Sequence, residues 1–63
     1  MNLQEMRLAK GLSQSQLSKK SGVSLGHIKN LEQGQRDINK TAGIILYRLA
    51  KALECDMKDL LKI

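Results

Sequence analysis

Residues 14–33, QSQLSKKSGVSLGHIKNLEQ, limit the possible folds of this chain more than any other stretch. Gly22 stands between two segments that carry apolar residues at helical spacing. Glycine adopts a left-handed backbone without steric cost, so the chain can reverse there. The first segment offers Leu17 to a core, and the second offers Ile28 and Leu31, three apart on one helix face. The stretch therefore predicts two short helices joined by a tight turn.

This arrangement is the helix-turn-helix pattern, in which the second helix enters the major groove of DNA. Capping residues mark the helix limits. Asn2 is an N-cap for a first helix that Gly11 ends, while Ser13 and Gln16 form a capping box for the second. Ser24 caps the third. The predicted helices cover about residues 2–10, 14–20, 24–33, 41–54 and 56–62.

The two C-terminal helices follow a polar connection over residues 35–41. The fourth helix has a broad apolar stripe, formed by Ile45, Leu46, Leu49, Ala50 and Leu53. The fifth turns its apolar residues inward, namely Met57, Leu60 and Leu61. No strand signal appears, and the core must be aliphatic because Phe and Trp are absent. We therefore expect an all-α, compact five-helix bundle that forms one domain over residues 1–63.

Composition narrows the function. A single cysteine, Cys55, excludes an intramolecular disulfide and the usual zinc spacings, which favours a cytoplasmic setting without a metal. There is no apolar run long enough for a membrane span. The net charge is +5, and residues 1–40 hold seven basic and three acidic side chains. Most of the excess positive charge thus surrounds the helix-turn-helix, as expected for a polyanion partner, although such a charge also serves solubility.

An enzyme is disfavoured because the chain has one histidine, one cysteine and no glycine-rich phosphate loop. We expect no cofactor and no small-molecule substrate. The single aromatic residue, Tyr47, argues against recognition of single strands by stacking.

Three segments together, MRLAKGLSQSQLSKKSGVS, IKNLEQGQRDIN and YRLAKALECDMKDLL, cover most of the chain. In this order and spacing they resemble the Cro and lambda-repressor-like helix-turn-helix domains, also called XRE-like. The resemblance implies five helices, sequence-specific binding of double-stranded DNA and a homodimer on two half-sites. We expect a transcriptional regulator, a repressor, that inserts the helix over about 24–33 into the major groove.

The resemblance also implies roles for single residues. Leu25, Gly26 and Asn30 match positions that read base edges, and His27 and Lys29 match neighbours that contact the DNA backbone or bases. Gln14 matches a glutamine that contacts a phosphate and supports the recognition helix. Arg7 and Glu32 match a buried ion pair between the first and third helices, and the helical angle of Glu32 beside the buried stripe independently supports this pair.

Residue chemistry adds alternatives. Asn30 can pair with adenine, or be an ordinary solvated residue. Gly26 either lets the helix approach the groove closely or marks a helix that reads bases poorly. Ser13 and the helix start can bind a phosphate as well as cap the helix. Arg36 and Lys40 either clamp the DNA backbone on the far side or lie in a solvated loop.

Two further points concern partners. Leu25 and Gly26 are less polar than typical base readers, so the alternative function is a protein-interaction module of the same fold, an antitoxin-like or anti-repressor partner. The expected dimer patch is the C-terminal apolar edge, composed of Met57, Leu60, Leu61 and Ile63.

Overall fold

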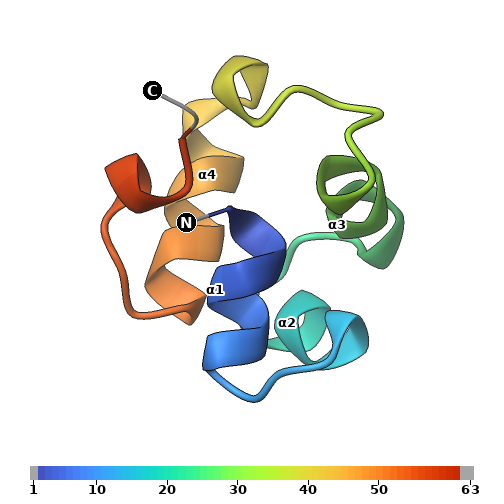
Figure 1. Cartoon of the computed structure of the whole chain (residues 1–63), viewed down its shortest axis with the longest axis vertical. Coiled ribbons are helices and arrows are strands. Elements are labelled where there is room, and N and C mark those ends of the chain that lie inside the picture. The colour runs from blue at the N-terminus through green and yellow to red at the C-terminus, as the bar shows by residue number, and fades with distance from the viewer. Residues whose placement is uncertain (1, 62–63) are drawn as a thin grey trace.

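The chain folds into four α-helices and two short 3-10 helices (Figure 1). The computed structural model describes residues 2–61, and no strand occurs among them. The elements are α1 (Leu3–Ala9), α2 (Gln14–Ser21), α3 (Leu25–Glu32), η1 (Ile38–Lys40), α4 (Gly43–Ala52) and η2 (Met57–Asp59). Their order confirms the all-α prediction and the two helices around the turn.

The first two helices begin with the capping residues predicted for them. Asn2 Oδ1 accepts a hydrogen bond of 2.8 Å from the N–H of Glu5, and Ser13 Oγ accepts one of 3.0 Å from Gln16. Both are full capping boxes, because the Glu5 and Gln16 side chains in turn accept from the backbone N–H of their cap residues. These local bonds explain why two helices of only seven and eight residues start at defined positions.

The turn between α2 and α3 has the left-handed glycine that the sequence predicts. Gly22 has a φ of 76°, and its N–H donates to the Ser18 carbonyl. Ser18 Oγ donates back across the turn to the Val23 carbonyl at 2.6 Å. Val23 is buried, so the turn is anchored in the core and the angle between α2 and α3 is held by packing as well as by hydrogen bonds.

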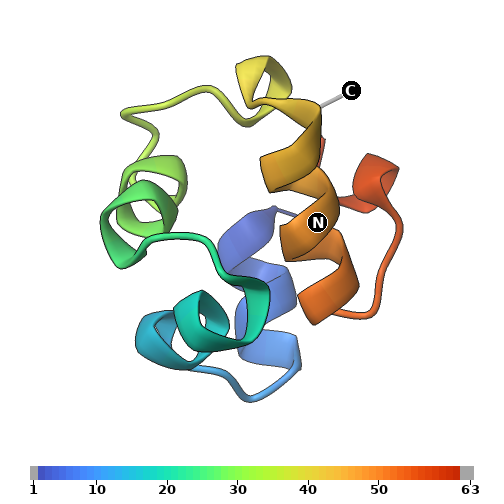
Figure 2. The same ribbon diagram turned by 180° about the vertical axis from the view of Figure 1, so that it is seen from behind.

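An aliphatic core joins the helices. Figure 1 shows α1 between α3 on one side and α4 with η2 on the other, and Figure 2 shows the end of α2 beside α4. Leu17 of α2, Ile28 of α3 and Leu49 of α4 are fully buried. Leu53 and Leu60 fill the space on the η2 side of the core. The predicted inward-facing stripes therefore converge on one core.

The five-helix prediction is wrong for the described residues, because the segment from 56 to 61 contains only the single 3-10 turn η2. Glu54 has a left-handed φ of 56°, which reverses the chain after α4. The short segment that follows can close few i→i+4 bonds, so a single tight turn with an Asp56–Asp59 capping box is the outcome. Lys62, the predicted end of helix five, lies outside the described residues.

Two other boundaries differ from the sequence prediction. The fourth helix begins at Gly43, since neither Thr41 nor Ala42 has a helical backbone, and it ends at Ala52. The connection before it was expected to be polar, but its Ile38 is buried within η1. Asp37 Oδ1 caps that turn by accepting from the N–H of Asn39 at 2.9 Å.

None of the helices described between residues 2 and 61 is long and apolar enough to cross a membrane.

Candidate nucleic-acid interface

The outer face of α3 lies opposite the residues that the helix packs into the core. Ile28 and Leu31 are buried, which turns Gly26 and Lys29 to solvent. Asn30 lies at the edge of this face, half-buried. The helix starts at a defined residue because Ser24 Oγ accepts from the N–H of His27 at 3.2 Å. Leu25, at the first position, is also partly exposed, so the predicted base-reading positions share one accessible surface.

Asn30 has a free side-chain amide but an occupied backbone carbonyl. No side chain or backbone group between residues 2 and 61 hydrogen-bonds its amide. Its carbonyl accepts from the N–H of Gln35 at 2.9 Å and of Arg36 at 3.2 Å, across the left-handed Gly34. The amide can therefore pair with an external group, while the backbone fixes the start of the loop that carries Arg36.

Gly26 has no steric reason within the fold to be a glycine. A Cβ placed on it would meet no atom within 4 Å, and its φ is not left-handed. Glycine inside a helix costs about 1 kcal/mol relative to alanine. The packing and the backbone conformation of the described residues therefore do not require a glycine at this position.

The carboxylate of Glu32 ties three helices together. Arg7 Nε of α1 lies 2.7 Å from Glu32 Oε2, and Arg7 Nη2 donates to Oε1 at 3.0 Å. Gln14 Nε2 of α2 donates to the same Oε1 at 3.1 Å. The two charged side chains are only 9% and 3% exposed. This is the ion pair expected from the sequence, and it holds α3 against α1 and α2.

A further bond completes the environment of the guanidinium. Arg7 Nη1 donates to the Leu12 carbonyl at 2.8 Å. This partner could not be predicted from residue types, because every residue carries a backbone carbonyl. Hydrogen bonding to Glu32 raises the pKa of Arg7 above its ordinary value, against the opposing effect of burial. Arg7 therefore stays charged beside Glu32.

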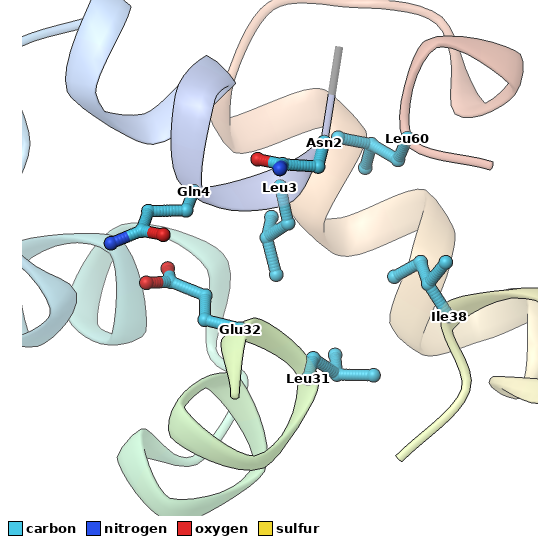
Figure 3. A pocket seen from close by; sticks show the side chains of 7 residues that line it. All are labelled: Asn2, Leu3, Gln4, Leu31, Glu32, Ile38 and Leu60. Atoms are coloured by element: carbon cyan, nitrogen blue, oxygen red, sulfur yellow. The ribbon is translucent and has the colours of Figure 1, made fainter. Parts of the chain in front are cut away.

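A small cavity of about 50 Å³ lies beside this pair, between the start of α1, the end of α3 and η1 (Figure 3). Figure 3 shows the side chains of Gln4 and Glu32 extending toward each other there, with Leu31 and Ile38 on the far side. Its volume corresponds to about one or two water molecules at about 30 Å³ each.

The start of α2 flanks one end of α3. Ser13 and Gln16 are committed to the capping box, and one amide N–H of Gln14 is committed to Glu32. The N–H groups of the first two helical residues have no intrahelical partner, as at any helix start. Ser13 is exposed and Gln14 half-buried, so this end offers backbone N–H groups and polar side chains to an anion.

A second group of predicted residues converges on the other flank of α3. His27, Arg36 and Lys40 line one open hollow of about 280 Å³, together with Asp37, Thr41 and Ala42. Arg36 and Lys40 are exposed, and the Asp37 carboxylate accepts from the backbone of Asn39. The structure thus brings together three residues separated by up to thirteen positions in the chain. Thr41 and Ala42, which were not predicted for the site, complete the hollow.

Lys29 stands apart from both groups, exposed on the outer face of α3. Three further lysines, Lys10, Lys19 and Lys20, are also exposed. Leu60, expected in a dimer patch, is 1% exposed and belongs to the core of its own chain, so that expectation is wrong for this residue. Met57 and Leu61 are half-buried, and Ile63 lies outside the described residues.

Comparison with known proteins places this geometry in a family. A helix-turn-helix family model matches residues 3–60. The chain is also similar to the restriction-modification controller protein C.AhdI from Aeromonas hydrophila, known from a high-resolution crystal structure. The two share 36% sequence identity with a TM-score of 0.82, over 94% of this chain and 85% of that one. No curated protein matches significantly. The chain therefore belongs to the XRE-like helix-turn-helix family of DNA-binding transcription regulators.

Proposed function

We propose that this chain, as a single domain over residues 1–63, binds double-stranded DNA sequence-specifically and inserts α3 into the major groove. The observation that carries the proposal is the arrangement around α3. An exposed face with the Asn30 amide at its edge lies between the exposed start of α2 and the hollow lined by Arg36 and Lys40, and the Glu32 network fixes the orientation of the helix.

Base reading is assigned to Leu25, Gly26 and Asn30. The Asn30 amide can donate to adenine N7 and accept from N6, which is a bidentate pairing in the major groove. Leu25 offers an apolar contact to a thymine methyl group. Gly26 supports close approach, because the fold itself has no need for a glycine there.

Affinity is assigned to the two flanks. Ser13, Gln14 and the start of α2 hold one phosphate stretch, while His27, Arg36 and Lys40 hold the other. Lys29 adds a phosphate contact from α3 itself. Contacts of this kind position the protein and make binding depend on salt, whereas the contacts to base edges decide the sequence.

A protein bound at an operator can regulate transcription by occupying that site. C.AhdI is a restriction-modification controller protein, and we propose a comparable regulatory role here, with repression by occupancy of the operator. We further propose a homodimer on two half-sites. Its apolar contacts would come from Met57 and Leu61, which the core leaves half-exposed, and from Ile63.

The test is selection from a pool of random duplexes by the full chain, followed by sequencing, at about 50 mM and 200 mM salt. The expected result is an enriched two-fold symmetric sequence with half-sites about 34–36 Å apart, with binding that weakens steeply at the higher salt. Enrichment of a single half-site would contradict the dimer. Salt-sensitive binding without enrichment would contradict base reading, and absence of binding at both salts would overturn the proposal.

The second candidate is a protein-interaction module with the same fold. The observation in its favour is the weakly polar start of α3, where partly exposed Leu25 and exposed Gly26 offer no hydrogen-bonding side chain. Absence of binding to duplex DNA at both salt concentrations in the same selection would favour this candidate.

A further inference from the structure

The outward side of α4 carries an exposed stripe that the DNA-binding proposal does not use. Ile44 and Tyr47 are 57% and 49% exposed, although both are large apolar side chains. Arg48 and Lys51 are exposed beside them. At 100° per residue these four positions fall within about 100° of one another, opposite the buried leucines of α4. We call this set of four residues the α4 stripe.

Two hollows flank Lys51 on this stripe. The hollow on the α2 side, where the end of α2 lies beside α4 (Figure 2), measures about 380 Å³. Its lining residues are Lys20, Ser21, Arg48, Lys51 and Ala52. The hollow on the η2 side measures about 440 Å³ and is lined by Tyr47, Ala50, Lys51, Cys55, Asp56 and Met57. One hollow is therefore cationic and the other mainly apolar.

The cations of the first hollow lack ion-pair partners within the described chain. Between residues 2 and 61 the salt bridge is Arg7–Glu32, and neither Lys20 nor Arg48 takes part in an ion pair. Lys51 Nζ lies 5.9 Å from the centre of the Tyr47 ring, a contact that orients the ammonium without neutralising it. No carboxylate lines this hollow, whereas Asp56 lines the apolar one.

The chemistry of these hollows selects one class of partner. A second copy seated on the stripe would bring Arg48 and Lys51 against the same cations, and like charges across an interface are unfavourable. A nucleic acid would satisfy the cations but leave Ile44 and Tyr47 unused. A protein segment with carboxylates on one side and apolar side chains on the other satisfies both, and Tyr and Arg are the residues enriched in such interfaces.

We propose that the α4 stripe and Lys20 form a docking surface for an acidic amphipathic segment of a partner protein. Its carboxylates pair with Lys20, Arg48 and Lys51, and its apolar side chains pack against the exposed Ile44 and Tyr47. None of these residues belongs to the two flanks of α3 or to its outer face, so a regulator bound to DNA can hold this partner at the same time. The proposal does not depend on DNA binding.

The probe is a fluorescein-labelled helical peptide of about 18 residues with leucines at i, i+4 and i+7 spacing and glutamates beside them, added to the full chain. Amide chemical shifts are expected to change along α4 and at Lys20. The double variant Arg48→Gln/Lys51→Gln is expected to lose about tenfold in affinity. The matched variant Lys19→Gln/Lys58→Gln removes the same charge from other exposed sites and is expected to stay within about twofold.

Several outcomes would overturn the proposal. Equal losses in both double variants would show attraction to net charge alone, and shift changes centred on α3 would place the peptide on the DNA-binding face. Unchanged affinity for a peptide with every glutamate replaced by glutamine would show that the cations do not contribute to binding. A dimer by sedimentation that Arg48→Gln/Lys51→Gln strengthens would assign the stripe to a second copy, because the variant removes like charges across that interface. Equal melting temperatures of the two variants confirm that both remain folded.

Discussion

Arg7 and Glu32 form a two-point ion pair between α1 and α3, with 2.7 Å from Nε to Oε2 and 3.0 Å from Nη2 to Oε1. Because Gln14 Nε2 shares the same Oε1 at 3.1 Å, one carboxylate fixes the recognition helix relative to both neighbouring helices. A buried pair of this kind contributes less to stability than to geometry, since desolvation offsets much of the attraction. Its removal, however, leaves a buried charge without a partner.

Glu32→Ala is therefore expected to lower the free energy of unfolding by about 3–5 kcal/mol. Urea denaturation followed by circular dichroism measures this loss. Gln33→Ala, at the next and exposed position, serves as the control and is expected to change stability by less than about 0.5 kcal/mol. The double variant Arg7→Leu/Glu32→Leu is expected to recover part of the loss, because neither charge is then left unpaired. A loss below about 1 kcal/mol for Glu32→Ala would mean that the pair is solvated.

Gly22→Ala is expected to destabilise the fold by about 1–2 kcal/mol, because alanine must take the left-handed φ of 76°. Gly43→Ala is the matched control. Gly43 has an ordinary helical φ, and a Cβ there meets no atom within 4 Å, so this variant is expected to gain about 0.4–1 kcal/mol. Thermal melts of both variants test whether Gly22→Ala lowers stability and Gly43→Ala raises it. Destabilisation by Gly43→Ala would contradict the open space around that residue.

Gly26→Ala separates folding from recognition. The added Cβ meets nothing in the fold, so stability is expected to rise by about 0.5–1 kcal/mol, while affinity for the selected duplex falls. Melting and duplex titration on the same sample provide both readouts. Increased stability with unchanged affinity would remove the close-approach role of Gly26.

Asn30→Ala and Arg36→Gln are expected to weaken DNA binding in different ways. Loss of the Asn30 amide should cost about 1–3 kcal/mol on the selected sequence and relax the preference for adenine at one position. Loss of the Arg36 charge should weaken binding to all duplexes alike and reduce the slope of log K against log salt by about 0.9. Titrations on selected and scrambled duplexes at several salts distinguish these effects, with Lys58→Gln as the control outside the proposed site. The same loss pattern for both variants would contradict the division into base and phosphate contacts.

Cys55 predicts a pH dependence at alkaline pH. Burial raises the pKa of its thiol, the carboxylates of Asp59 and Asp56 raise it further, and Lys10 opposes them. The folded chain thus keeps the proton to higher pH than the unfolded chain. The resulting stabilisation is complete below the unfolded pKa of about 8.5 and is lost as pH rises through the folded value.

Denaturation from pH 8 to pH 10 should therefore show a steeper loss of stability in the wild type than in Cys55→Ala. Lys10→Gln removes the opposing charge and is expected to slow the reaction of the thiol with a disulfide reagent. Equal slopes for wild type and Cys55→Ala would show that the thiol has the same pKa in both states.

Much of the helix-turn-helix could be predicted from sequence because its signals are local. Ser13 with Gln16, Ser24 and Gly22 act on their own backbone within a few residues, so the limits of α2 and the turn are encoded where they occur. Apolar spacing placed Ile28 and Leu31 inward for the same reason. The structure of residues 56–61, by contrast, was not determined by local signals alone. Burial of Leu60 against the core and the left-handed Glu54 replaced the predicted helix by one 3-10 turn.

For this protein, the sequence by itself determined the class of fold, the turn and the face of α3 that meets solvent, because capping bonds and helical periodicity depend on residues only a few positions apart. Only the tertiary structure decided which distant side chains meet. It brought His27 to Arg36 and Lys40, placed Gln14 on the Arg7–Glu32 pair, and buried Ile38 within a loop that reads as polar. Those contacts depend on how the helices pack around a shared core, and packing is a property of all the elements at once.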